Sequence, residues 1–234
     1  MSSGAAQGLF QRAIVESGGG WGKPLPAEAM QKRVGKGLKA VGVPDGIDAP
    51  ALRALPPNRL IEALGADRAM GFGPFIDGKT VSEAPFAVFA AGRQMQVPLV
   101  IGSNDWEANL LKAYGGGGMR GKFMAYFPPA FGWYEGRAKD AEQRKSLLFT
   151  DLVFSAPARW IAAAQSKVAP AYLYRFTHVS AGRRKDVPGA GHGTEIAYVF
   201  DNLDATEKSA RSADAGHRKL AAMLADCWVA FAVE

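Results

Sequence analysis

Two residues of the sequence combine the right chemistry with the right positions to exchange protons. Glu107 lies a few residues after the apolar run 99–101, which is typical of a strand buried on both faces. His192 lies between two glycines, on a loop that follows the strand-like segment 172–176. In open parallel sheets, ligands bind at the carboxyl ends of the strands. A carboxylate and a histidine on two such loops are two of the three groups of an acid–base–nucleophile triad.

Each of these residues also has a simpler interpretation. A histidine between glycines can be no more than a turn, and Glu107, two residues after Asp105, can be the solvated start of a helix. In favour of His192 as a general base, its small neighbours leave both imidazole nitrogens accessible. The other histidines are weaker candidates: we expect His217, beside two basic residues, at the surface, and His178 in a loop or packing role.

The sequence offers no matching nucleophile. The strained elbow that exposes a nucleophilic serine requires Gly-x-Ser-x-Gly, and none of the serines has both glycines. Ser17 has Val15 at the first glycine position, and Ser180 has His178 there. Neither His-x-His nor His-Glu-x-x-His occurs, and the single cysteine, Cys227, lies on the apolar stripe of a predicted helix, where we expect it to be a small core residue. We therefore expect no metal and no cofactor.

The elements that must position these residues alternate between strands and helices. Buried strands are predicted at 13–15, 99–101 and 172–176, and helices at 24–41, 60–64, 82–92, 108–114 and 204–234. Asp151 is predicted to cap a further helix that contains Trp160. The pattern indicates an α/β fold with a mostly parallel sheet flanked by helices. Because a strand lies almost at the first residue and the last helix has no cap, residues 1–234 are expected to be a domain truncated at both ends.

Composition excludes several other classes of protein. With 234 residues and 48% hydrophobic content, the chain can form one sizeable core. The net charge of +6 is spread along the chain, apart from the short basic run 183–185, and no nucleic-acid-binding motif accompanies it. No apolar run reaches the ~18 residues of a membrane span. Residues 115–118 are four glycines without the Gly-Lys-Ser/Thr ending of a phosphate-binding loop, and are predicted to be a flexible loop.

Six motifs, in order along nearly the whole chain, carry a family resemblance. The chain resembles the C-terminal part of the type B carboxylesterase family, the carboxylesterase and cholinesterase group of α/β-hydrolases. The motifs are Gly8-Leu9-Phe10-Gln11-Arg12-Ala13-Ile14-Val15-Glu16-Ser17-Gly18, Pro74-Phe75-Ile76-Asp77-Gly78, Val97-Pro98-Leu99-Val100-Ile101-Gly102-Ser103-Asn104-Asp105-Trp106-Glu107, Asp151 with Phe154, Gly189-Ala190-Gly191-His192-Gly193-Thr194-Glu195-Ile196-Ala197-Tyr198-Val199-Phe200, and Trp228 with Phe231-Ala232.

The resemblance implies a fold, an activity and a role for three residues. It implies the C-terminal portion of an α/β-hydrolase fold with helical excursions, and hydrolysis of a small-molecule carboxylic ester by Ser-His-Glu acyl transfer in the intact parent. Glu107 matches the family's triad acid, His192 its base, and Ser17 a serine that hydrogen-bonds the acid from behind rather than the nucleophile. The family's serine elbow and oxyanion loop lie upstream of the Gly-Leu-Phe motif, so this chain alone is expected to be inactive.

A second reading remains open. Non-catalytic binding or adhesion proteins share this fold, although they usually lose one triad position, and this chain retains both Glu107 and His192. In either case, a sheet without its first strands would expose an edge, so self-association through that edge is expected.

Overall fold

The computed structural model describes residues 1–19, 24–64, 73–113, 132–205 and 214–233, which form parts of two compact units. The first unit comprises 1–9 and 22–95, and the second comprises 10–21 and 96–234. The four glycines at 115–118, the predicted stop of a helix at residue 65 and residues 206–213 of the predicted last helix lie outside the described residues.

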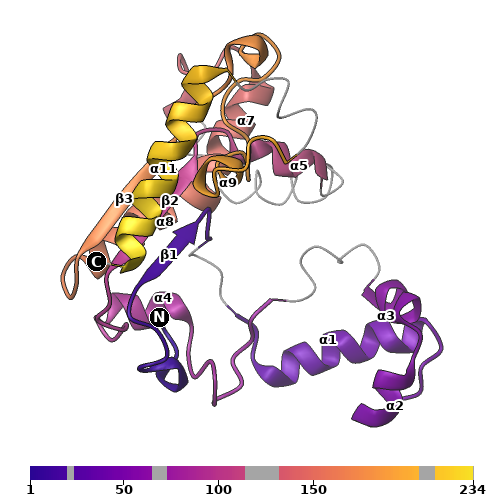
Figure 1. Cartoon of the computed structure of the whole chain (residues 1–234). Helices are drawn as coiled ribbons and strands as arrows, with labels where there is room; N and C mark the ends of the chain where they lie inside the picture. Colours follow the sequence, from indigo (N-terminus) through magenta and orange to yellow (C-terminus); the bar gives the residue numbers. More distant parts are fainter. Residues whose placement is uncertain (20–23, 65–72, 114–131, 206–213, 234) are drawn as a thin grey trace. The chain divides into compact units, whose positions relative to one another are not determined.

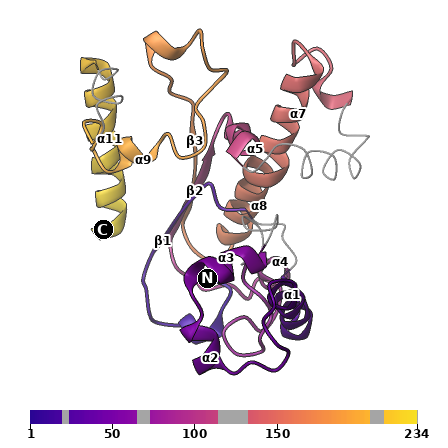
Figure 2. The same ribbon diagram turned by 90° about the vertical axis from the view of Figure 1, so that its right-hand side faces the viewer.

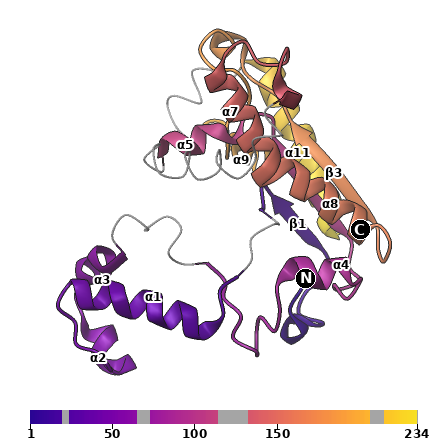
Figure 3. The same cartoon turned by 180° about the vertical axis from the view of Figure 1, so that it is seen from behind.

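The regular structure described in the first unit consists mainly of short helices. They are α1 (Ala27–Ala40), α2 (Ala49–Ala54), α3 (Pro57–Leu64) and α4 (Pro85–Ala90), preceded by the 3-10 turn η1 (Gly4–Ala6). α1 packs against α3, as Figure 3 shows from behind. Three of these helices confirm the predictions for 24–41, 60–64 and 82–92, whereas α2 was not predicted. It begins where the Asp48 carboxylate accepts a hydrogen bond from the Ala51 amide at 2.8 Å.

Among the described residues, the second unit is built on a parallel sheet of three strands in the order β1 (Ala13–Glu16), β2 (Leu99–Asn104) and β3 (Ala171–Phe176). Helix α11 (Ala215–Val233) lies on one side of the strands, while α7 (Ala141–Thr150) and α8 (Ala156–Gln165) lie on the other (Figures 1 and 2). Leu99 and Ile101 of the central strand are fully buried. The α/β prediction is therefore correct, and the three predicted strands are present. The expectation that all three are buried was wrong: β1 is half-buried, and Tyr172 and Leu173 of β3 are 58% and 49% exposed.

A π-helical turn, η5 (Asp151–Ser155), joins α7 to α8 in one continuous helical stretch. The stretch begins at Asp140, whose side chain accepts a hydrogen bond from the Gln143 amide at 2.7 Å. The prediction that Asp151 caps a helix was therefore wrong: Asp151 lies inside the stretch, and its carboxylate accepts a hydrogen bond from the Tyr134 hydroxyl at 2.6 Å. The sequence pattern placed the start of this helical stretch at Asp151, whereas α7 begins at Ala141.

The same stretch, Ala141–Gln165, is the one helix of the described residues that is long and apolar enough to cross a membrane, and 39% of its most apolar window is buried inside the protein. Length and composition do not separate a spanning helix from a core helix. Four of its side chains, Leu148, Phe149, Phe154 and Ala158, are buried within the second unit.

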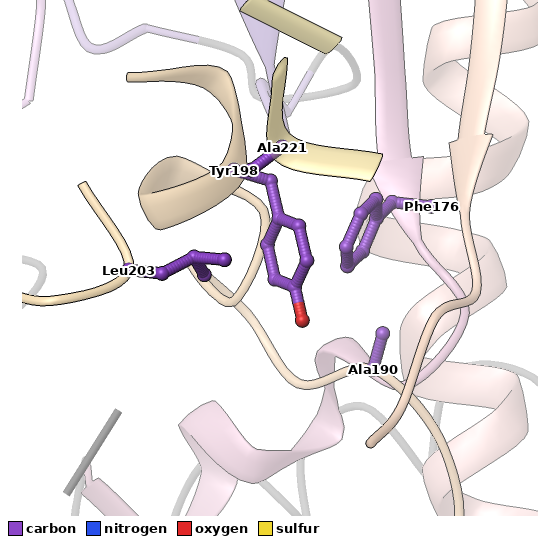
Figure 4. Close-up of a cluster of buried hydrophobic side chains, with 5 residues drawn as sticks. All are labelled: Phe176, Ala190, Tyr198, Leu203 and Ala221. Atoms are coloured by element: carbon purple, nitrogen blue, oxygen red, sulfur yellow. The ribbon is translucent and has the colours of Figure 1, made fainter. Parts of the chain in front are cut away.

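A cluster of buried side chains joins α11 to the segment that follows β3. Figure 4 shows the Tyr198 ring of α9 (Ile196–Val199) beside Phe176 and Leu203, with Ala190 and Ala221 completing the cluster. Tyr198 and Phe176 have ring centroids 5.2 Å apart. Because Ala190 lies two residues before His192, this cluster supports the loop that carries the histidine.

Two predictions about α11 were wrong. His217 is only 4% exposed rather than on the surface, because the rings of Tyr198 and His178 close over it. Its Nδ1 lies 2.6 Å from a carboxylate oxygen of Asp214. Cys227, predicted in the core, is exposed, because the neighbouring Trp228 makes the contact with the sheet through Tyr174.

Candidate active site

The three residues singled out by the sequence lie beyond the carboxyl ends of the three strands. Ser17 directly follows β1, Glu107 opens the 3-10 turn η3 (Glu107–Asn109) after β2, and His192 lies on the loop after β3. Because the strands are parallel and in register, these ends meet at one edge of the sheet. Ser17 has a positive φ of 51°, which is uncommon outside glycine, and its amide donates to the Gly102 carbonyl at 2.9 Å.

The carboxylate of Glu107 and the imidazole of His192 are in direct contact. His192 Nδ1 lies 2.6 Å from Glu107 Oε2, with the Glu107 side chain 0% exposed and the His192 side chain 34% exposed. The acid is therefore held away from water, whereas part of the imidazole stays accessible. Since Nδ1 is engaged by the acid, Nε2 is the ring nitrogen left to exchange a proton with a substrate.

Two further hydrogen bonds end on the other oxygen of Glu107. Oε1 accepts from the Ser17 hydroxyl at 2.6 Å and from the Asn104 backbone amide at 2.7 Å. Together with the contact to His192, these bonds hold the Glu107 carboxyl in one orientation. The bond to Glu107 in turn raises the pKa of His192 above its usual range, against the opposing effect of burial. The pair thus holds the imidazole in one orientation and stabilises its protonated form.

Backbone and side-chain hydrogen bonds fasten the acid loop to the base loop. Asp105 accepts from the Ala190 amide at 2.7 Å, and the Trp106 amide donates to the Ala190 carbonyl at 3.0 Å. The His192 amide donates to the Asn109 side chain at 2.6 Å. These bonds fix the backbone on both sides of the imidazole.

Glycine at position 189 is required by this close approach. A Cβ at Gly189 would lie 2.6 Å from Asp105 Oδ1 and 2.9 Å from Trp106 Cβ, closer than real Cβ contacts. Gly189 therefore lets the loop of the acid and the loop of the base touch.

Phe154 of the π-helical turn η5 covers one side of the base. Its ring centroid lies 5.5 Å from that of His192, tilted by 45°, and Phe154 is itself buried against Phe149. π-helical turns occur often at functional sites. Here the turn delivers an aromatic ring to the imidazole.

Asn104 and Glu195 belong to the site, but no role for them was predicted. Both are buried, and the Asn104 side chain donates to a carboxylate oxygen of Glu195 and, at 2.6 Å, to the Gly191 carbonyl. The available signal was their position: each lies within three residues of Glu107 or His192 in the sequence. Among the described residues, no three His, Cys, Asp or Glu side chains gather as metal ligands.

Comparisons with known proteins agree with this architecture. The model of the carboxylesterase family matches residues 1–122 and 125–234. The para-nitrobenzyl esterase of Bacillus subtilis is 26% identical over 97% of this chain and 49% of its own length. The fumonisin B1 esterase of Sphingopyxis macrogoltabida is 28% identical over 100% of this chain and 45% of its own length. The human protein named neuroligin-2 is 27% identical over 83% of this chain and 27% of its own length.

Solved structures show the same relationship. A Geobacillus stearothermophilus carboxylesterase superposes with a TM-score of 0.77 at 26% identity, over 99% of this chain and 50% of that one. The chain spans about half the length of the esterases that it matches. With a family model that covers nearly every residue and a shared fold, the chain belongs to the carboxylesterase family.

Proposed function

We propose that this chain carries the acid and the base of a serine carboxylesterase site, and that polypeptide outside these 234 residues supplies the nucleophilic serine. The observation that carries the proposal is the 2.6 Å contact between His192 Nδ1 and a Glu107 carboxylate that is fully buried. No serine in the sequence lies in Gly-x-Ser-x-Gly. Ser17 is engaged as a hydrogen-bond donor to Glu107.

In the proposed reaction, His192 Nε2 accepts the proton of the serine hydroxyl as that oxygen attacks an ester carbonyl. Glu107 holds the imidazole tautomer and stabilises the imidazolium, which then protonates the leaving alcohol. In the second step His192 accepts a proton from water, the water oxygen attacks the acyl-enzyme, and the proton returns to the serine oxygen as the carboxylic acid product leaves. The substrate class is therefore a small-molecule carboxylic ester.

The activity of the 234-residue chain alone is expected to be negligible. Without a serine nucleophile there is no covalent route, and removal of a single oxyanion-hole donor already costs about 10²–10³ in rate. The direct measurement is hydrolysis of p-nitrophenyl acetate by the purified chain and by its His192→Ala variant. Equal rates at background support the proposal, whereas hydrolysis that His192→Ala abolishes would place a nucleophile within this chain.

The complete site is tested with the longer protein that the gene encodes, if the reading frame extends upstream of Met1. If the reading frame continued upstream of Met1 encodes Gly-x-Ser-x-Gly, the longer protein is expected to hydrolyse p-nitrophenyl esters. His192→Ala is expected to lower its kcat by about 10⁴ or more, as for other triad residues. A longer protein with the elbow that binds esters without turning them over would instead favour the non-catalytic binding role.

We also propose that an outer strand of the sheet mediates self-association by pairing with a strand of another copy of the chain. β1 and β3 are the outer strands of the sheet among the described strands. An unpaired edge offers backbone N–H and C=O groups to another strand. Light scattering behind size exclusion is expected to show dimers or larger species whose share grows with concentration, and a strictly monomeric chain would refute this.

A further inference from the structure

A second buried glutamate lies beside the acid–base pair and has no part in the proton transfers described. Glu195 is 2% exposed and lies three residues after His192. Its carboxyl group contacts the Asn104 side-chain amide, which is fully buried. A buried carboxyl needs a structural or chemical reason, because its desolvation costs free energy.

Asn104 connects that carboxyl to both members of the pair. Its backbone amide donates to Glu107 Oε1 at 2.7 Å, and its side-chain amide donates to the Gly191 carbonyl at 2.6 Å. Gly191 immediately precedes His192. A group that holds the Asn104 side chain therefore acts on the acid through one bond and on the base loop through another.

The two glutamates differ in the donors that they receive. Glu107 accepts from the Ser17 hydroxyl and the Asn104 backbone amide and contacts His192. In the described part of the chain, Glu195 accepts from the Asn104 side chain and from its own backbone amide. Two charged carboxyls buried beside one asparagine would repel each other. In the proposed triad Glu107 is the anionic partner of the imidazolium, so the inference concerns the state of Glu195.

Asn104 itself supplies a second indication. Its Oδ1 atom is buried and has no hydrogen-bond partner in the described structure. An uncharged carboxyl carries a hydrogen that such an acceptor can receive, and a carboxylate carries none. Burial also raises the pKa of Glu195.

We propose that Glu195 is a positioning residue: an uncharged carboxyl group that holds Asn104 in place and, through it, fixes Glu107 and the loop of His192. The inference rests on the proposed roles of Glu107 and His192. It assigns opposite charge states to two neighbouring glutamates, so replacing each by glutamine must have different effects.

The test is the NMR titration of the His192 imidazole in the full chain, with the signal assigned by its loss in His192→Asn. Glu107→Gln is expected to lower the His192 pKa by about one unit, because it removes the anionic partner. Glu195→Gln, an uncharged isostere, is expected to change it by less than about 0.3 units. Glu195→Ala releases Asn104 and is expected to lower the His192 pKa in the same direction as Glu107→Gln.

A matched control is Glu16→Gln, which changes a carboxyl of the same unit that accepts from the Trp228 indole at 2.6 Å and makes no bond to Asn104. It is expected to leave the His192 pKa unchanged. In the unaltered chain, the ¹³C shift of the Glu195 carboxyl at pH 7 is expected to be that of the protonated form. This measurement decides the charge state even if a variant fails to fold.

The outcomes separate the two proposals. An unchanged His192 pKa in Glu107→Gln would overturn the acid–base pair and the role of Glu195 with it. A normal response of Glu107→Gln, combined with a large shift in Glu195→Gln or an ionised Glu195 signal at pH 7, would overturn only the uncharged state. A Glu195→Ala variant with the unaltered His192 pKa would overturn the positioning role.

Discussion

The hydrogen bond from Ser17 to Glu107 makes a sharp stability test, because the residue also has unfavourable backbone geometry. Ser17 is 8% exposed, and its hydroxyl donates to a fully buried carboxylate at 2.6 Å. A hydrogen bond to a charged group contributes about 1.5–3 kcal/mol, so Ser17→Ala is expected to lower the free energy of unfolding by that amount. Alanine carries a Cβ as serine does, so this substitution does not relieve the backbone strain of the positive φ of 51°.

Ser17→Gly separates the two effects. Glycine loses the same hydrogen bond but relieves about 1–2 kcal/mol of left-handed backbone strain, less about 0.4–1 kcal/mol for the greater freedom of the unfolded chain. Ser17→Gly is therefore expected to be about 0.5–1 kcal/mol more stable than Ser17→Ala. Both variants are expected to raise the His192 pKa further, because a carboxylate with one donor fewer attracts the imidazolium proton more strongly.

The assay is urea unfolding at pH 7 followed by tryptophan fluorescence, which reports on the second unit because all five tryptophans fall within its residue ranges. Ser180→Ala is the matched control, since the Ser180 hydroxyl is buried and has no hydrogen-bond partner among the described residues, so its removal is expected to be neutral. If Ser17→Ala were as stable as that control, the bond to Glu107 would contribute nothing. A Ser17→Gly variant less stable than Ser17→Ala would refute the strain.

Three further predictions concern the sheet, the loops and the charge of the pair. Gly102→Ala places a Cβ against the backbone and ring of Tyr174 on β3, so a loss of about 1–3 kcal/mol or failure to fold is expected in thermal unfolding, and near-normal stability would contradict the register. Asp105→Ala removes the acceptor of the Ala190 amide, so the hydrogen-exchange rate of that amide is expected to rise about tenfold. An unchanged exchange rate would show that this bond does not hold the loop of His192. The raised pKa of His192 means that the folded state binds its proton more tightly, so this contribution to stability is complete below the unfolded pKa near 6.5 and is lost as pH rises through the folded value. Urea unfolding from pH 5 to 9 is expected to show this loss in the unaltered chain and not in Glu107→Gln, and parallel curves would refute it.

Local sequence patterns predicted the elements that position the site. The apolar runs at 13–15, 99–101 and 172–176 are strands, and the central one is buried because strands on both edges and helices on both faces cover it. The outer strand β3 exposes Tyr172 and Leu173, so its apolar pattern predicted the strand but not its exposure. Glu107 and His192 were selected because each follows a strand, and their contact agrees with that choice. Their catalytic roles stay a proposal.

The failures share a physical cause, which is long-range packing. His217 looked exposed because its sequence neighbours are basic, yet the rings that bury it come from residues 178 and 198. The pairing of Asn104 with Glu195 spans 91 residues of sequence, so no local pattern contains it. Asp151 resembled a cap because its partner, Tyr134, was not foreseeable as a donor.

The π-helical turn η5 is equivalent to one extra residue held within a single turn of a continuous helix. Deleting one residue there would restore ordinary α-helical geometry and leave the faces of α7 and α8 aligned, with Leu148 and Phe149 still directed into the core. The change would fall on the segment that carries Phe154, whose ring would lose its position beside the imidazole. In evolutionary terms, a one-codon insertion or deletion at this point can add or remove the aromatic cover of the base without rebuilding the helices on either side.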